Sequence, residues 1–199
     1  MYEDCAEDRV WKTTDSEHLW VMDKLILSRK LGYTCGPTGL DVPAPGNYIV
    51  RPCVNMLGLG LGTSERYLVD DTTALPLGYF WCEKFQGRHL SIDYYYGNPV
   101  LSVEGIKDPK TFTKWSKWFK VSNTIPFPSI LNGFEKYEWI NCEFIDGNLI
   151  EVHLRRNEDF ENDIEIFIPV WEGEEINVPE NMKYIKYPDL HGRKGAYVK

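Results

Sequence analysis

Alternating apolar and polar residues predict two strands in the second half of the chain, on either side of an Asp-Gly-Asn sequence at residues 146–148. This sequence favours a tight turn, so the pattern predicts a β-hairpin with strands of about six residues. Period-two alternation gives the hairpin an apolar face that carries Ile140, Cys142, Phe144, Ile150, Val152 and Leu154. The opposite face carries Asn141, Glu143, Glu151, His153 and Arg155, with Ile145 and Leu149 near the turn.

Two glutamates of this hairpin are predicted to face each other. With a three-residue loop at 146–148, Glu143 lies directly opposite Glu151 and Asn141 lies opposite His153. Two carboxylates on one face repel each other unless a cation or a basic group lies between them. Because Mg²⁺ in nucleotide enzymes is bound by one or two carboxylates and by phosphate oxygens, the pair is a candidate metal site. The alternative is a solvated face whose charges serve only solubility.

The first half of the chain contains a predicted helix and a glycine-rich segment. A capping-box sequence at 14–17 precedes residues at helical spacing, which predicts a helix over 15–31 that contains Lys24. A strand is predicted at 48–51, and Pro52 ends it. Glycine then occupies every second position from Gly58 to Gly62, with a spacing that matches neither the P-loop nor the dinucleotide fingerprint. Such a run permits backbone N–H groups to approach a ligand closely, as in a loop that covers phosphates.

The remaining segments predict strands and one further helix. Strands at 78–83, 90–96 and 100–103 are predicted to form an antiparallel meander. Asp108-Pro109 is a favourable helix start, and the helix after it would carry aromatic residues on one face and lysines on another. We expect this helix to dock through its aromatic residues, with a patch for an anionic partner as the alternative. A strand is predicted at 164–168, and irregular structure is expected from Pro169 onward.

Composition narrows the class of protein. The 199 residues suffice for one domain or for two small lobes that share a ligand cleft. The net charge of −8 disfavours a nucleic-acid partner, because phosphate binding needs a basic field. The five cysteines lack paired close spacing, so we expect no disulfide framework, no zinc site, and a reducing intracellular setting. Since the acidic start does not resemble a signal peptide and no apolar run could span a bilayer, we expect a soluble, cytoplasmic protein without a membrane partner.

Taken in order over about residues 20–160, these segments resemble the ATP-grasp superfamily. Asp23-Lys24 looks like the Asp-Lys of the helix before the first lobe, residues 48–52 look like its strand ending in Lys-Pro, and the glycines at 58–62 look like its flexible loop. Residues 83–93 are similar to its hinge segment, and Glu143 with residues 151–155 is similar to its metal-binding acid and Glu-x-Asn-x-Arg ending. The resemblance implies an α+β fold in a single domain of residues 1–199. Two small lobes with antiparallel sheets, over about 1–100 and 101–199, would clasp a nucleotide.

The resemblance also implies a role for individual residues. The cofactors would be ATP and Mg²⁺, with Glu143, Glu151 and His153 as metal ligands. Arg155 and Arg51 would stabilise charge on the phosphoryl group during transfer. Lys24, with Lys12 as the alternative, would neutralise the ATP phosphates. The implied nucleotide site as a whole consists of Lys24, Arg51, Gly58, Gly60, Gly62, Glu83, Lys84, Phe85 and His89, in which Glu83 accepts from the adenine amino group and the backbone around Phe85 binds the adenine edge.

The chain departs from the superfamily's pattern at several points. His153 stands where Asn is usual, Arg51 replaces a lysine, and the N-terminal lobe that helps to bind the acceptor is missing. The resemblance implies a carboxylate–amine or carboxylate–thiol ligase that acts through an acyl phosphate on a carboxylate-bearing peptide or protein. The alternatives are a phosphotransferase with the same fold and a non-catalytic nucleotide-binding or structural virion protein. The small size is one associated with bacteriophage-encoded proteins, and the cytoplasm would then be that of the host.

Overall fold

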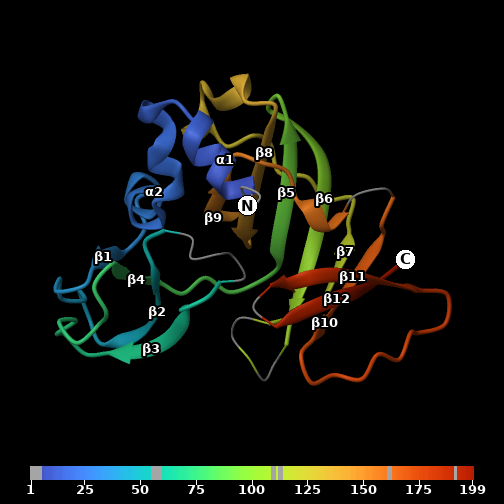
Figure 1. Cartoon of the computed structure of the whole chain (residues 1–199). Coiled ribbons are helices and arrows are strands. Elements are labelled where there is room, and N and C mark those ends of the chain that lie inside the picture. Colours follow the sequence, from blue (N-terminus) through green and yellow to red (C-terminus); the bar gives the residue numbers. More distant parts are fainter. Residues whose placement is uncertain (1–5, 55–59, 109–110, 112–113, 161–162, 191) are drawn as a thin grey trace.

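Two antiparallel sheets of unequal size form the framework of the protein (Figure 1). The computed structural model describes residues 6–54, 60–108, 111, 114–160, 163–190 and 192–199. The small sheet has the strand order β1-β4-β2-β3, and the large sheet has the order β11-β12-β10-β7-β6-β5-β8-β9. The small sheet consists of β1 (Cys35–Pro37), β2 (Gly46–Pro52), β3 (Ser64–Leu68) and β4 (Tyr79–Glu83). The large sheet consists of β5 (His89–Tyr95), β6 (Asn98–Lys107), β7 (Trp115–Lys120), β8 (Trp139–Ile145), β9 (Asn148–His153), β10 (Ile166–Trp171), β11 (Lys183–Leu190) and β12 (Arg193–Val198).

Short helices cover one face of the large sheet. They are α1 (Ala6–Thr13), η1 (Ser16–Met22), α2 (Lys24–Lys30), η2 (Ser129–Leu131) and η3 (Phe134–Lys136). The short helix η4 (Glu158–Phe160) lies on the other face, where Phe160 packs with Val103 and Phe167. Val21 and Leu27 from the N-terminal helices pack with Ile92, Ile140 and Phe144 of the sheet in the largest apolar core. The α+β class with antiparallel sheets is confirmed. Among the described residues, no helix is both long and apolar enough to cross a membrane.

The predicted helix over 15–31 is wrong as a continuous element. The chain forms the 3₁₀ helix η1 and then α2, with Asp23 between them in an extended conformation. The Asp23 carboxylate accepts hydrogen bonds from the N–H groups of Leu25 and Ile26 at 2.9 and 3.0 Å, so it caps α2. The backbone N–H of Lys24 donates to the carbonyl of Cys53 at 2.7 Å, which fixes the start of α2 against the end of β2. The apolar pattern predicted helical structure but not this break.

Three further predictions are corrected by sheet pairing. Residues 115–120, predicted as part of a helix, form β7 between β6 and β10. The segment beyond Pro169, predicted as irregular, contains β11 and β12, and β12 pairs with β10. The strands of the predicted meander do not all pair, because β4 belongs to the small sheet whereas β5 pairs with β6 in the large sheet. In each case a partner distant in sequence decided the structure.

The predicted hairpin is confirmed as β8 and β9, with a different turn. Ile145 pairs with Asn148, so the loop has two residues, and both of them, Asp146 and Gly147, have positive φ values of 49° and 81°. A bulge between Glu143 and Phe144 in the pairing register places Ile150 as the extra residue of β9. The bulge offsets the shorter loop, and Glu143 therefore still faces Glu151.

The bulge also exchanges two side chains between the faces of β9. Leu149, predicted on the polar face, is buried in the core opposite Phe144. Ile150, predicted on the apolar face, lines a cleft on the other side of the sheet. The face that carries Glu143 and Glu151 therefore gains an apolar residue next to its acids.

The segment 84–88 joins the two sheets. The N–H of Asp146, at the hairpin turn, donates to the carbonyl of Arg88 at 2.9 Å. Gly87 has φ +126°, and a Cβ there would lie 2.7 Å from the Asp146 Cβ, so only glycine fits between the linker and the turn. Lys84 contacts Glu65 of β3 at 2.8 Å. The linker is thereby attached to both sheets, and it forms the back of the space between them.

Candidate functional site

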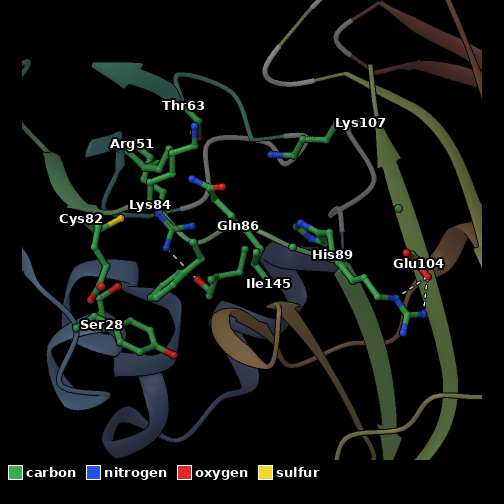
Figure 2. Close-up of a pocket in the computed structure, with 18 of the residues that line it drawn as sticks. Ser28, Arg51, Thr63, Cys82, Lys84, Gln86, His89, Glu104, Lys107 and Ile145 are labelled. Atoms are coloured by element: carbon green, nitrogen blue, oxygen red, sulfur yellow. Dashed lines mark hydrogen bonds and ion pairs between the residues drawn. The ribbon is translucent and has the colours of Figure 1, made fainter. Parts of the chain in front are cut away.

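A cleft of about 660 Å³ lies between the two sheets and the 84–88 linker. Its wall is built from α2, β2, β4, β5, β6 and the hairpin (Figure 2). The apolar lining residues include Tyr33, Ile49, Cys82, Phe85, Ile145 and Ile150. The polar lining residues include Ser28, Arg51, Thr63, Glu83, Lys84, Gln86, His89 and Lys107.

The apolar part of the cleft suits a flat ring. The rings of Tyr33 and Phe85 are 4.7 Å apart in a T-shaped arrangement, and both line the cleft. Ile49 from the small sheet and Ile150 from the large sheet also line it. A planar aromatic ligand between these side chains would be removed from water on both faces, which stabilises it by apolar burial and by ring contacts.

An acidic side chain and the start of the linker border this apolar part. The Glu83 Oε1 accepts from the N–H of Thr34 at 2.8 Å, and the N–H of Glu83 donates to the Thr34 carbonyl at 2.9 Å. These bonds hold the Glu83 carboxylate at the wall of the cleft, as expected for a residue that recognises a ligand N–H group. Lys84 and Phe85 continue the chain along the cleft. Glu83 and Phe85, predicted for base recognition, and Lys84, predicted for the nucleotide site, therefore line one cavity.

Arg51 connects the two sheets across the cleft. Its Nη2 donates to the carbonyl of Ile150 at 3.0 Å, and its guanidinium lies 5.3 Å from the centre of the Phe80 ring. The Arg51 Nε is buried and has no hydrogen-bond partner among the described residues. The bulge residue of β9 thus accepts a bond from the small sheet, and the remaining guanidinium donors face the cleft lining.

Lys107, at the end of β6, was not among the predicted site residues. It lines the cleft, and Figure 2 shows it reaching in from the large sheet, with Arg51 on the other side. Burial lowers the pKa of Lys107, and the charges of Arg51 and Lys84 lower it further, whereas Glu143 opposes the shift. The predicted strand ended at residue 103, which hid Lys107. Alternation extended through Gly105 would have placed it on the face of the sheet that carries His89.

Basic side chains lower the pKa values of the two facing glutamates, Glu143 and Glu151. Lys24 Nζ and His153 Nε2 each lie 3.3 Å from Glu151 Oε1. Burial raises the pKa of Glu151, but the charge of Lys24 and the bond from His153 outweigh burial and hold that pKa well below its usual range. His89 Nε2 lies 2.9 Å from Glu143 Oε2, and this bond lowers the Glu143 pKa against the effect of burial. Both carboxylates are therefore ionised at neutral pH.

The predicted glycines and Arg155 are not among the described residues that line the cleft. Gly60 and Gly62 have φ values of 64° and 76°, and a Cβ at Gly62 would collide with Tyr79. Gly58 lies outside the described residues. Arg155 donates to the carbonyl of Arg156 at 3.1 Å and is not among the residues that line the cleft.

The two lysines predicted as alternatives for neutralising the phosphates differ in their exposure. Lys24 is 5% exposed and contacts Glu151, whereas Lys12 is exposed on α1.

Across the described residues, three or more metal-capable donor atoms converge within 4.8 Å only in an outer group of Asp15, Glu17 and His18. Glu143, Glu151 and His153 therefore do not form a closed three-donor cage.

Comparisons with known proteins give structural neighbours only. No family model and no curated protein matches the chain. A solved structure from Archaeoglobus fulgidus, described as an ATP-grasp superfamily protein, is similar with a TM-score of 0.48 and 10% identity, over 89% of this chain and 64% of that one. The ATP-grasp ligase PsnB with a minimal precursor has a TM-score of 0.46 and 13% identity, over 69% and 52%. An L-amino acid ligase from Bacillus licheniformis has a TM-score of 0.44 and 13% identity, over 69% and 41%.

This chain spans less than two thirds of the length of each of these three proteins. Two of them carry the name of the superfamily that the sequence segments resemble. The likeness is one of arrangement only.

Proposed function

We propose that the cleft binds ATP with Mg²⁺ and that the protein is an ATP-dependent ligase of the ATP-grasp type. The observation that supports this most directly is that one cleft joins an aromatic wall and cations from both sheets, and that two ionised, facing carboxylates lie next to it. Glu143 and Glu151 do not line the cleft themselves, but Glu143 bonds His89 of its wall and Glu151 directly follows Ile150 of its wall. A purine would occupy the aromatic wall, and a polyphosphate would occupy the charged part. Neither half alone would distinguish ATP from other apolar or anionic ligands.

The base and the sugar would be recognised by residues at the linker. Glu83 would accept from the adenine amino group, and Tyr33 and Phe85 would pack together against the ring. The His89 Nδ1 is buried without a hydrogen-bond partner among the described residues, while its Nε2 bonds Glu143. A ribose hydroxyl can donate or accept, so it could satisfy the Nδ1 atom in either protonation state of the ring.

The phosphates would be held by cations and by the glycine loop. Arg51, Lys84 and Lys107 line the cleft and would neutralise the phosphate oxygens. Lys24 would serve the same polyphosphate by exchanging its contact with Glu151 for one with phosphate. The loop at Gly60 and Gly62, next to Thr63 of the cleft wall, would approach the phosphates through its backbone N–H groups.

The donor chemistry of the facing glutamates fits Mg²⁺. Two ionised carboxylates supply hard oxygen ligands, and Mg²⁺ usually completes its shell with phosphate oxygens and water, so a closed protein cage is not required. His153 fits a different task, because its Nε2 already lies 3.3 Å from Glu151 Oε1. We propose that His153 orients Glu151, while Glu143 and Glu151 hold the ion. Bound Mg²⁺ would supply charge neutralisation at the transferring phosphate.

The proposed reaction has two steps. A carboxylate oxygen of the acceptor attacks the γ-phosphorus of ATP, the bond to the β-phosphate oxygen breaks, and ADP leaves. An amine or thiol then attacks the acyl carbon, loses its proton and displaces inorganic phosphate. Arg51 and Lys107 would stabilise the charge that develops during transfer, with Arg155 proposed for the same role at the acceptor side. The acceptor is proposed to be a carboxylate-bearing peptide or protein.

Titration calorimetry with Mg-ATP tests the nucleotide site first. We expect binding, and we expect Phe85→Ala to weaken it about tenfold, because the base loses an aromatic wall. Tyr67→Ala is the matched control, since Tyr67 is 66% exposed and does not line the cleft. No binding at millimolar nucleotide, or equal effects of the two variants, would contradict the proposal.

Hydroxylamine then tests the reaction class. A ligase that forms an acyl phosphate should yield a hydroxamate from a panel of peptide carboxylates with Mg-ATP, together with ADP. ADP release without a hydroxamate, and with phosphate on a hydroxyl group, would indicate a phosphotransferase. Binding without any turnover would indicate a nucleotide-binding protein that is not an enzyme.

A further inference from the structure

Two buried cysteines face each other in the small sheet. Cys35 of β1 and Cys82 of β4 are direct antiparallel partners. Both are free thiols, with 9% and 6% of their surface exposed, and they belong to one apolar cluster with Phe80. Directly paired residues project to the same face of a sheet, so the two thiols lie side by side.

The hydrogen bonds around the pair define its spacing. The N–H of Thr38 donates to the Tyr79 carbonyl at 3.2 Å, and the N–H of Glu83 donates to the Thr34 carbonyl at 2.9 Å. Because hydrogen-bonded and non-hydrogen-bonded pairs alternate, the cysteine pair between them is a non-hydrogen-bonded one, with Cα atoms about 4.5 Å apart. Disulfides accept Cα separations of about 4.4–6.8 Å. The sheet therefore holds the two thiols within bridging range.

The pair also belongs to the wall of the cleft. Cys82 lines the cleft, where Figure 2 shows its sulfur, and Ile49, its partner on the other side, lines it too. Glu83, proposed to recognise the base, directly follows Cys82. Tyr33, proposed to pack against the base, lies two residues before Cys35. A bond between the sulfurs would take the Cys82 side chain out of the wall and restrain both recognition residues.

We propose that Cys35 and Cys82 are a redox site, oxidised to a disulfide by peroxide, and that the disulfide weakens nucleotide binding. The Cys82 sulfur, reached through the cleft, attacks one peroxide oxygen, which gives a sulfenic acid and water. The Cys35 sulfur then attacks the sulfenic sulfur, the S–S bond forms and a second water leaves. In total, two thiols and one hydrogen peroxide give one disulfide and two waters, and a dithiol reductant reverses the change. The effect on nucleotide rests on the proposed function, whereas formation of the disulfide does not.

Access controls the rate of this oxidation. Burial raises the pKa of the Cys82 thiol, although the Arg51 guanidinium opposes part of the rise, and burial also raises the pKa of Cys35. The thiolate is the reactive form, so oxidation should be slow and should depend on entry of the oxidant through the cleft. A bound nucleotide would block that entry.

Peptide mapping of the full chain after hydrogen peroxide treatment tests the redox site. We expect a Cys35–Cys82 crosslinked peptide that dithiothreitol removes and that forms more slowly with Mg-ATP present. Cys53→Ser should still form it, because Cys53 is the neighbouring thiol of the same cluster but not the cross-strand partner. Cys35→Ser should not form it. Absence of the crosslinked peptide in the parent protein, or a Cys82–Cys53 crosslink instead, would overturn the assignment.

Calorimetry with Mg-ATP on reduced and oxidised protein tests the consequence. We expect the dissociation constant to rise about tenfold on oxidation, which corresponds to about 1.4 kcal/mol, and to be unchanged by peroxide in Cys35→Ser. Equal or tighter binding by the crosslinked protein would overturn control of the cleft. If neither form binds Mg-ATP, the proposed function fails together with control of the cleft, while the peptide map alone still decides the redox site.

Discussion

Two buried cations, Arg51 in the wall of the cleft and Lys24 next to it, each have a contact that offsets part of the cost of burial. Lys24 and Arg51 are 5% and 8% exposed, and they contact Glu151 and the Ile150 carbonyl. A charge removed from water costs several kcal/mol unless a partner compensates it, so a fold optimised for stability alone seldom gathers such groups. Their position at and next to one cleft is typical of ligand chemistry.

Replacing Glu151 with glutamine tests the proposed metal site. Glu151→Gln keeps the shape of the side chain and removes a negative charge from the facing pair. We expect Mg²⁺-dependent ADP release to fall about a hundredfold or more, with a native circular dichroism spectrum. Glu180→Gln, at an exposed position, is the control. Turnover by Glu151→Gln equal to that of the parent would show that the metal site is assigned wrongly.

A second acid, Asp93, should make stability depend on pH. Its carboxylate accepts from Asn141 Nδ2 at 2.8 Å and from the N–H of Asn157 at 3.0 Å. Burial raises the Asp93 pKa above the usual 3.8, although these bonds oppose the shift. The neutral form is therefore favoured in the folded state, so the contribution of Asp93 is full below the unfolded pKa and is lost as pH rises through the folded pKa.

Urea unfolding of Asp93→Asn and the parent, from pH 3.8 to neutrality, measures this contribution. The stability of the parent relative to the variant should decline with rising pH, by about 1.4 kcal/mol for each unit of pKa shift. Asp41→Asn, at an exposed site, is the control. A difference that stays constant or grows with pH would contradict the direction of the shift.

At the scale of elements, local patterns predicted the hairpin well because its strands are neighbours in the chain. The facing of Glu143 and Glu151 was predicted with a three-residue loop, and it is found with a two-residue loop and a bulge. A three-residue loop and a two-residue loop with a bulge give the same pairing from Glu143 and Glu151 onward. The alternation of residues alone could therefore not distinguish the two structures. The position of Ile150 depends on that difference, and the sequence therefore missed a residue of the cleft wall.

Elements defined by distant partners were predicted poorly. Trp115 and Phe119 fit one face of a helix with Lys117 on another face, but the same residues can also form a strand. Pairing with β6 and β10 decides for the strand. The same error hid Lys107, because a helix start was placed next to it at Asp108. Residues carried by the family resemblance, such as Glu83 and Arg51, do line the cleft. Arg155 does not line the cleft, because its position depends on how the chain leaves β9. Others of the set do not line it either, among them Lys24, Glu143, Glu151 and His153.

Deleting Ile150 removes the bulge and keeps the neighbouring Glu143–Glu151 pair. With a two-residue loop and no bulge, Glu143 still faces Glu151, so the hairpin should form and the protein should remain folded. The carbonyl that accepts from Arg51 and the Ile150 side chain of the wall would both be lost. We expect affinity for Mg-ATP to fall about tenfold, measured by calorimetry. Ile150→Ala keeps the bulge and should bind more tightly than the deletion; equal affinity of the two would assign the effect to the side chain alone.

For the whole molecule, the cleft is shared by two sheets that each have their own apolar cluster. They are connected through the 84–88 linker, the contact of Arg51 with Ile150, and α2, which begins against the end of β2. A ligand in the cleft would add contacts to both sheets at once. Binding should therefore stabilise the protein as a unit and restrict the linker between the sheets.

Thermal unfolding and hydrogen exchange with Mg-ATP measure this coupling. Nucleotide at a hundred times its dissociation constant should add about 2.7 kcal/mol of stability, because it binds only the folded chain. For a chain of this size the melting temperature should rise by about 5–10 °C. Exchange should slow at Thr63 beside the small sheet, at Phe85 of the linker and at Ile145 of the large sheet, which all line the cleft. It should not slow at Tyr67 on the outer edge strand. Protection limited to one sheet would show that the ligand does not bridge the cleft, and the two-sheet nucleotide site would have to be abandoned.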